Sequence, residues 1–246
     1  MFTSERYRRL SALLTRRYDL SPDADLGWLV GVILGDGYIW RVQSGGYVIG
    51  LDTPEAYYAT LFSNTMAKRF PGLWVRQYFR RRNRQFDGKK FIEEVYTVRA
   101  VSKFLYDFLR PHKQPDFHWT IPSSIRESQA CTRGFLQGIF DAEGGVHSSR
   151  PRICITSKHW QNLSPVRELL QEFGIESRPY LDRNCSRLFI QRKKALVLFR
   201  DEIGFRLPRK QQRLVSATEP APVRQAPQES ERHGQIAKKG GVGRLQ

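Results

Sequence analysis

Two short segments of the chain end in the same way, with an acidic residue followed by glycine. The first is LVGVILGDG, residues 29–37, with Asp36 as its acid, and the second is LQGIFDAEG, residues 136–144, with Glu143. If both segments are helical, each acid faces the negative end of a helix dipole, which costs up to about 1 kcal/mol. Because this placement occurs twice, we expect the carboxylates to be functional. Two carboxylates that meet repel each other unless they are protonated or share a cation, and the oxygen-preferring cation for such a site is Mg²⁺.

Small residues recur four positions apart in both segments, at Gly31 and Gly35 and again at Gly138 and Ala142. Residues at i and i+4 share one face of a helix, and small residues there allow two backbones to approach closely. We therefore expect these four residues to form a helix–helix interface with both acids at its end. The predicted metal ligands are the two acids together with Gly35 and Ala142.

The paired segments resemble the motifs of the LAGLIDADG homing endonucleases, in the single-chain, two-repeat form of the archaeal intron-encoded type. The first copy agrees with the family name at Leu29, Gly31, Ile33, Asp36 and Gly37. The second agrees at Leu136, Gly138, Asp141, Ala142 and Gly144, with Glu143 in place of the second aspartate. The resemblance covers roughly residues 25–207.

The elements expected around the two motifs repeat in the same order. The predicted fold is α+β, with two pseudo-symmetric α-β-β-α-β-β-α repeats that form a saddle of two antiparallel sheets around a central two-helix interface. Strands are expected over 38–42, 47–53, 73–83 and 91–100, and again over 152–158, 177–183 and 187–193. The predicted domains are a basic helical extension (1–24, with a helix over 4–18), the first repeat (25–110), a linker (111–128), the second repeat (129–215) and a disordered basic tail (216–246).

Composition points to a polyanionic partner. The chain has 246 residues, a formal net charge of +17 and a sequence pI of about 10.2. Residues 216–246 contribute five basic and three acidic residues, so most of the charge lies in the predicted repeats. A membrane is disfavoured as partner because no long apolar run or signal core is present. Cys131, Cys154 and Cys185 are odd in number and widely spaced, which favours free thiols inside a cell, in a prokaryotic cytoplasm or nucleoid or else in an organelle.

Double-stranded DNA is the expected partner of the two sheets. An antiparallel sheet can keep one face on the core and one in water, and arginine or glutamine on a β-ribbon can read base edges in the major groove. Phosphate contact is the alternative role for each of these residues. The predicted DNA-binding residues are Arg41, Gln43, Arg76, Gln77, Arg80, Arg82, Arg84, Gln85, Lys89 and Arg99 in the first repeat, and Arg152, Arg178, Arg183, Arg187, Gln191 and Arg192 in the second.

The resemblance implies metal-dependent phosphodiester hydrolysis, with Mg²⁺ or another divalent cation such as Mn²⁺. It implies one carboxylate for each strand and a double-strand break with short 3′ overhangs. It also implies a basic residue near the attacking water, for which Lys158 is the candidate. The corresponding stretch of the first repeat, residues 51–53, has no lysine, so either a water network replaces it there or one strand is cut more slowly. Trp28 and Trp40 are expected in the core.

The sequence therefore predicts a monomeric homing endonuclease that acts at a long, asymmetric intron insertion site. Two alternatives use the same scaffold. One is a maturase that binds intron RNA and helps splicing, and the other is a DNA-binding regulator that does not cleave. Acids in both motifs favour the enzyme over the regulator, whereas maturase activity could coexist with cleavage.

Overall fold

The structure is a computed structural model that describes residues 15–43, 45–147 and 150–219. The helix predicted over residues 4–18 lies almost entirely outside the described residues, and so does the predicted tail from residue 220 onward. Among the helices of the described residues, none combines the length and apolar character that crossing a membrane requires.

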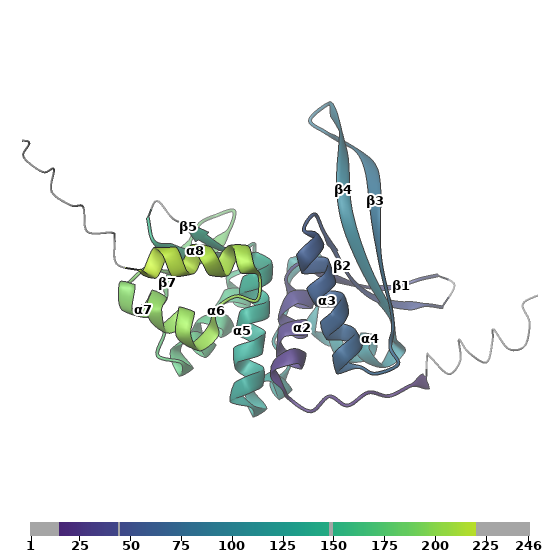
Figure 1. Cartoon of the computed structure of the whole chain (residues 1–246), viewed down its shortest axis with the longest axis horizontal. Coiled ribbons are helices and arrows are strands. Elements are labelled where there is room, and N and C mark those ends of the chain that lie inside the picture. Colours follow the sequence, from purple (N-terminus) through teal and green to yellow (C-terminus); the bar gives the residue numbers. More distant parts are fainter. Residues whose placement is uncertain (1–14, 44, 148–149, 220–246) are drawn as a thin grey trace, which may run out of the picture.

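Two repeats with the same order of elements lie side by side (Figure 1). The first contains α2 (Ala24–Leu34), β1 (Gly37–Arg41), β2 (Tyr47–Thr53), α3 (Ala56–Arg69), β3 (Trp74–Phe86), β4 (Lys89–Val101) and α4 (Lys103–Leu109). The second contains α5 (Gln129–Glu143), β5 (Gly144–His147), β6 (Arg152–Ser157), α6 (Trp160–Glu172), β7 (Arg178–Leu181), β8 (Ser186–Ile190) and α7 (Lys193–Leu198). Both sheets are antiparallel and have equivalent strand orders, β1-β2-β4-β3 and β5-β6-β8-β7. The predicted duplicated α+β fold is confirmed.

The two motif helices begin at side-chain caps. Asp23 accepts a hydrogen bond of 2.7 Å from the Leu26 amide at the start of α2, and Ser128 accepts one from the Cys131 amide at the start of α5. Such caps satisfy amides that have no partner within the helix. Both motif helices are largely buried, as the lengths of their apolar runs suggest.

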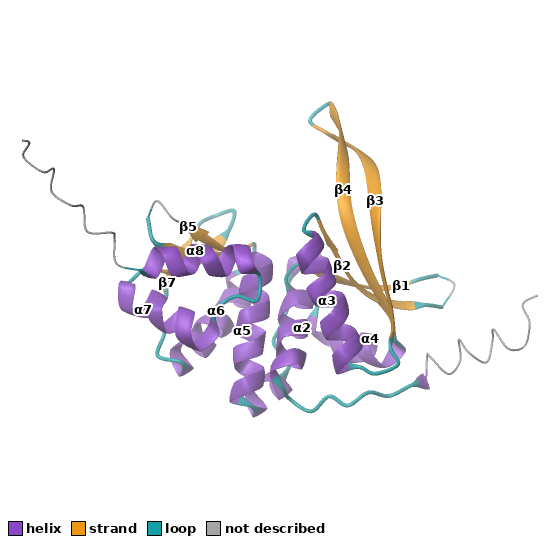
Figure 2. Ribbon diagram, viewed as in Figure 1, coloured by secondary structure: helices purple, strands orange, loops and turns teal. Residues whose placement is uncertain are grey.

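One face of each sheet is covered by helices and carries the core (Figure 2). Trp28 is fully buried in that core, as predicted. The prediction for Trp40 is wrong, because its side chain is 52% exposed. Trp40 lies on the edge strand β1 and pairs with Val48, which puts its side chain on the face that the helices leave open.

The β3–β4 hairpin is longer than the sequence predicted. Asp87 and Gly88 both have positive φ, 49° and 72°, and together they form a two-residue turn that allows the strands to continue to its edge. Each strand has 13 residues, whereas β7 and β8 have 4 and 5. The hairpin therefore projects well beyond the rest of its sheet (Figures 1 and 2).

The segments that follow each repeat are also structured. The linker contains three short 3₁₀ turns, Arg110–His112, Pro115–Phe117 and Ser123–Glu127. After α7 the chain forms a π-turn, Phe199–Ile203, and then α8 (Pro208–Thr218), a helix that the sequence did not predict. Because α8 continues past residue 215, the predicted boundary between second repeat and tail falls inside a helix.

Candidate functional site at the helix seam

Helices α2 and α5 pack against each other along their small residues, a contact that we call the seam (Figure 1). A Cβ atom added to Gly31 would lie 2.4 Å from the carbonyl oxygen of Phe135, and one added to Gly138 would lie 2.2 Å from that of Trp28. A Cβ on Gly35 would lie 2.6 Å from the Cβ of Ala142. The structure thus brings the four predicted interface residues to the contact, and at two of them no side chain fits.

Two further glycines, which were not among the predicted interface residues, extend the seam by one turn. A Cβ on Gly27 would lie 2.0 Å from the carbonyl oxygen of Cys131, and one on Gly134 would lie 2.2 Å from that of Ala24. The signal was present in the sequence, since both residues continue the four-residue spacing towards the N-terminus. The seam is therefore a backbone-to-backbone contact over most of its length.

Asp36 and Glu143 lie at the same end of the seam. Asp36 occupies the turn between α2 and β1, and Glu143 is the last residue of α5; both reach the surface. Surrounding protein atoms displace water and raise the pKa of both carboxyls. The negative charge of Asp36 further raises the pKa of Glu143, while the positive charges of Lys113 and Lys210 lower the pKa of each acid. These two acids and two lysines form one electrostatic cluster.

The two lysines cap the two seam helices in equivalent ways. Lys113 Nζ donates hydrogen bonds to the carbonyl oxygens of Leu34 (2.7 Å) and Gly35 (3.2 Å) at the end of α2. These are carbonyls that have no partner within the helix, at the negative end of its dipole. Burial lowers the pKa of Lys113 to about 8, although Glu143 and Asp36 act in the opposite direction.

Lys210, on α8, does the same for α5. Its Nζ donates to the carbonyl oxygens of Phe140 (3.2 Å), Asp141 (2.5 Å) and Ala142 (3.4 Å). Burial lowers its pKa as well. Neither lysine was predicted as a site residue, because the contacts span 68–70 residues here and 78–79 residues at Lys113. A usable signal was that one lysine follows the closing helix of each repeat.

These caps bear on the predicted metal ligands. The carbonyl oxygens of Gly35 and Ala142 already accept hydrogen bonds from the lysines. Within the described residues, no group of three or more histidine, cysteine or acidic side chains is placed to hold a metal ion. The site therefore offers two carboxylates as side-chain ligands for a cation. The carbonyl oxygens of Gly35 and Ala142 stay predicted ligands, because a carbonyl oxygen that accepts one hydrogen bond keeps a second lone pair.

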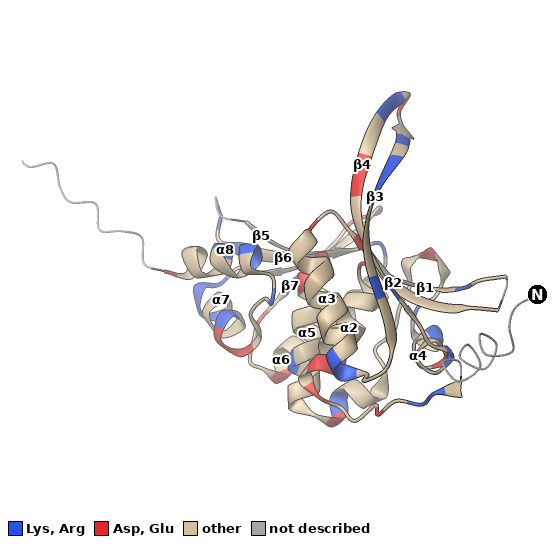
Figure 3. Ribbon diagram, turned by 45° about the vertical axis from the view of Figure 1, so that its right-hand side comes forward, with Lys and Arg blue, Asp and Glu red and all other residues tan. Residues whose placement is uncertain are grey.

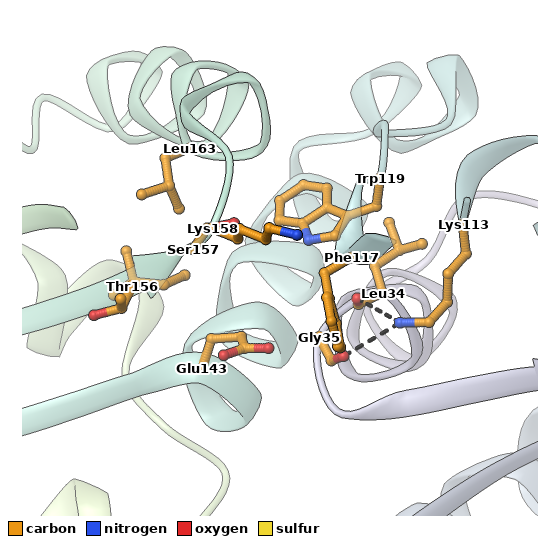
Figure 4. A pocket seen from close by; sticks show the side chains of 11 residues that line it. Leu34, Gly35, Lys113, Phe117, Trp119, Glu143, Thr156, Ser157, Lys158 and Leu163 are labelled. Carbon is orange, nitrogen blue, oxygen red and sulfur yellow. Dashed lines mark hydrogen bonds between the residues drawn. The ribbon is translucent and has the colours of Figure 1, made fainter. Parts of the chain in front are cut away.

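A pocket of about 330 Å³ opens beside Glu143 (Figure 4). Gly35, Lys113 and Phe117 line it on one side, and Glu143 and Lys158 on the other. The structure thus places Lys158 beside one of the two acids.

The first repeat has no lysine equivalent to Lys158. Gly37 pairs with Leu51 in the first sheet, and Gly144 pairs with Ile155 in the second. This register aligns Lys158 with Pro54, one residue beyond the stretch that the sequence comparison used. The asymmetry between the two halves of the site therefore remains in the structure.

In the first sheet, a row of predicted DNA-binding residues lies on the face away from α3. Residues that pair across two strands point to the same face of the sheet. By this register the side chain of Asp52 shares its face with five of the predicted residues: Arg76, Arg80, Arg82, Arg84 and Arg99. Asp52 Oδ2 accepts hydrogen bonds of 2.5 Å from both Arg80 and Arg82. Figure 3 shows basic residues continuing along the projecting hairpin, where Lys89 follows the turn.

Three other predicted residues have different surroundings. Gln77 lies on the opposite face, where its Nε2 donates to Thr60 Oγ1 of α3 at 3.1 Å. Gln85 shares that face by strand alternation. Arg41 stacks on the ring of Tyr47, 5.7 Å from its centroid, at the helix-covered side. Gln77 and Arg41 therefore have partners within the protein, whereas Gln43 lies in the loop just after β1.

The second sheet presents a shorter basic face. Arg152 lies over the ring of Phe189 and Arg187 over that of Tyr180, with 5.1 and 5.9 Å to the centroids. Arg178 pairs with Phe189 and so shares this face. Arg192 instead forms an ion pair of 2.5 Å with Glu176. Arg183 lies in the turn between β7 and β8, and Gln191 directly follows β8.

Comparison with known proteins identifies relatives of this arrangement. A family model described as a LAGLIDADG-like domain matches residues 130–204, within the second repeat. An uncharacterized protein of Methanocaldococcus jannaschii is 25% identical over 218 residues, which cover 81% of this chain and 73% of that protein. The match to a second uncharacterized protein of that organism, at 23% identity, covers 69% of this chain and 62% of that protein.

Two solved structures share the fold. The homing endonuclease I-WcaI bound to its DNA recognition sequence is 14% identical and superposes with a TM-score of 0.65, covering 87% of this chain and 95% of that chain. I-DmoI in complex with DNA and Ca is 18% identical with a TM-score of 0.54, covering 79% of this chain and 98% of that chain. At these identities the likeness establishes the two-repeat architecture.

Proposed function

We propose that this chain is a LAGLIDADG homing endonuclease, a site-specific, metal-dependent enzyme that cuts both strands of a long, asymmetric DNA target and leaves short 3′ overhangs. One observation carries the proposal. Asp36 and Glu143, from separate repeats, meet in one electrostatic cluster at the end of the seam, next to two sheets with basic faces.

The donor set fits a hard divalent cation. Asp36 and Glu143 provide carboxylate oxygens at the surface, which suit Mg²⁺ and also Mn²⁺. Burial and the negative charge of Asp36 both raise the pKa of Glu143, and a bound cation would offset that repulsion. When bound, the cation supplies Lewis-acid activation of a phosphoryl oxygen and of water.

The lysines supply fixed positive charge to the same site. Lys113 and Lys210 are each held by two or three carbonyl oxygens, so their ammonium groups are positioned before DNA arrives. Preorganised charge of this kind stabilises the negative charge that develops on the phosphate and the leaving oxygen. Lys158 adds a third ammonium group on the Glu143 side only, so we expect the two strands to be cut at different rates.

One chain provides both halves of the site, so the active species is a monomer. The arginines of the two open faces hold the duplex by phosphate and base-edge contacts. The unequal hairpins suit a target without palindromic symmetry, such as the insertion site of the intron that carries the reading frame. RNA binding on the same scaffold is the alternative.

The proposal is tested by selecting, from a library of DNA duplexes, those that the protein cleaves. A library of duplexes randomised over about 30 bp is incubated with the protein and Mg²⁺, and cleaved duplexes are recovered and sequenced, with EDTA as the control. We expect Asp36→Asn or Glu143→Gln to impair cutting and the double variant to abolish it, while binding persists. Glu55→Gln, a nearby acid that pairs with Arg209, is the matched control.

Three results would contradict the proposal: cleavage by the double variant, cleavage that persists in EDTA, or recovery of no duplex at all. Tight binding of structured RNA together with the last result would favour the maturase alternative.

A further inference from the structure

A loop of the linker lies next to the acidic end of the seam. An isolated β-bridge joins Lys113 to Trp119, and the amide of Gln114 donates to the carbonyl oxygen of His118 at 2.9 Å, which closes the loop. Asp116 and Phe117, at its tip, have φ of 63° and 64°. Side chains with a Cβ rarely adopt this left-handed region, and a bulky residue such as phenylalanine does so least. The loop must be held in this conformation by its surroundings.

Residues of the second repeat, chiefly Asn162 of α6, stabilise this loop conformation. Asn162 is fully buried; its Oδ1 accepts from the Trp119 amide at 3.1 Å, and its Nδ2 donates to the Phe117 carbonyl oxygen at 2.8 Å. His159 Nε2 lies 2.8 Å from the carbonyl oxygen of Asp116. The loop backbone is therefore held at Asp116, Phe117 and Trp119 by side chains of the second repeat, and these contacts leave the Phe117 side chain free.

Phe117 is 79% exposed, more than any other large apolar side chain whose exposure the structure describes. Its ring stands between Glu143 and Lys113 in the view of Figure 4, and all three residues line the same pocket. An exposed ring forgoes the stabilisation that burial would give. Phe117 thus combines a strained backbone conformation with an exposed ring in the pocket that Glu143 lines, and strain of this kind is found at ligand-binding sites.

The minor groove is the surface that a duplex would present here. The two acids lie together, so the two phosphates at which hydrolysis is proposed must also lie close together. Phosphates of opposite strands approach each other across the minor groove, which is only about 6 Å wide. Proteins that bind this groove often insert phenylalanine or another apolar wedge between base pairs and partly unstack them.

We propose that Phe117 is such a wedge, and that it enters a minor-groove base step between or beside the two cuts. The inference rests on the proposed function and deepens it. Pyrimidine–purine steps unstack most readily, so the wedge makes the chain favour a target with a TA or CA step at that position. Phe117 would then select sequence by the ease of deformation, in a region that the arginines of the sheets do not reach.

The test uses the duplex recovered by selection with the wild-type protein, with 2-aminopurine at each central base in turn. Binding is followed in EDTA, so that no cleavage intervenes. We expect the wild-type protein to raise the fluorescence of one step and to lose about tenfold in affinity when that step is changed to GC. Phe117→Ala should lose both effects, and Phe117→Leu should keep part of each. Phe79→Ala, an exposed phenylalanine on the hairpin face opposite Arg80, should behave as wild type.

A stability measurement checks the loop conformation independently of DNA. Glycine adopts positive φ without strain, so Phe117→Gly should unfold at a higher urea concentration than Phe117→Ala. An equal or lower midpoint would overturn the inference. So would unchanged fluorescence and step preference in Phe117→Ala, in which case the proposed function would stand if the wild type cuts. Recovery of no duplex by the wild type would overturn both.

Discussion

The guanidinium group of Arg206 forms an ion pair of 2.8 Å with Asp25, a residue 181 positions earlier in the chain. The same guanidinium lies over the ring of Trp28, 5.0 Å from its centroid, and donates to Gln137 Oε1 at 2.6 Å. The segment that leads into α8 is thereby tied to both seam helices. Because α8 carries Lys210, this contact connects the far end of the chain to the candidate site.

Asp25→Asn should lower stability in a pH-dependent way. Burial raises the pKa of Asp25, but hydrogen bonds from Lys68 and Arg206 outweigh it and lower the pKa overall. A carboxyl whose pKa is lower in the folded state stabilises the protein above its unfolded pKa, and this stabilisation is lost as pH falls through the folded pKa. We expect the variant to lose about 1 kcal/mol of unfolding free energy at pH 7, and the difference to shrink as the pH falls below about 4.

Urea unfolding of the wild type and of Asp25→Asn, at pH 7 and at a pH below about 4, measures the difference in unfolding free energy. Asp107→Asn, which removes an exposed pair with Lys103, should change stability by less than about 0.5 kcal/mol and serves as the control. A gap between wild type and Asp25→Asn that stays constant or grows on acidification would contradict the assignment.

Adding one methyl group to the seam should be costly. In Gly31→Ala and Gly138→Ala the new Cβ meets a backbone carbonyl of the partner helix, which cannot move without separating the helices. Overpacking of this kind costs about 1–3 kcal/mol or more. Gly46→Ala, whose Cβ would meet only the Val42 side chain at 3.5 Å, should stay within about 0.5 kcal/mol of wild type in urea unfolding. Equal stability of the seam and control variants would mean that the helices are farther apart than described.

Removal of one capping lysine should affect the two strands unequally. Lys113→Met and Lys210→Met keep the apolar stem but lose the charge beside the helix ends. We expect each variant to slow one of the two cuts by about 100-fold or more, so that nicked DNA accumulates, with opposite strands affected in the two variants. Strand-specific end labels on a selected duplex give the readout. Lys68→Met, at an exposed pair far from the acids along the seam, should cut both strands normally.

Asp52 should limit non-specific DNA binding. Its carboxylate holds Arg80 and Arg82 and also presents a negative charge on the open face of the first sheet. Asp52→Asn should increase affinity for random duplex DNA and steepen the dependence of log K on log salt by about one. Fluorescence anisotropy over a salt series measures both quantities. Glu94→Gln, which pairs with Arg81 on the opposite face, should leave the slope unchanged; equal effects of the two variants would contradict a specific role for Asp52.

Local signals in the sequence were sufficient for the repeated architecture. The four-residue spacing of glycines indicates the seam, and the two acid–glycine ends indicate which end of it matters. Alternation and turn residues then place the strands. These signals do not show which distant segments of the chain come into contact when it folds. The contacts of Lys113 and Lys210 depend on how the segments after each repeat fold back onto the helices. The position of each lysine after a closing helix does not by itself reveal such a contact in a chain with 41 basic residues.

Residue type alone also could not show on which face of its sheet a strand residue lies. Arg76 and Gln77 are neighbours, and both types suit base recognition, yet Gln77 binds α3 while Arg76 lies on the open face. Register decides between them, because adjacent strand residues point in opposite directions. The same reason explains why Trp40 is exposed although its type suggests the core.

The projecting hairpin gives this protein a part that can change length without disturbing its centre. Beyond Arg80 few side chains of the two strands belong to the hydrophobic core. Each whole strand has 13 residues and is therefore roughly 40 Å long at about 3.4 Å per residue. Insertion or deletion of two residues in each strand would preserve the orientation of every side chain, whereas a change of one would invert the side chains between that point and the turn. During divergence, new target lengths are therefore accessible in paired steps on this arm, while the glycine-packed helices tolerate almost no change.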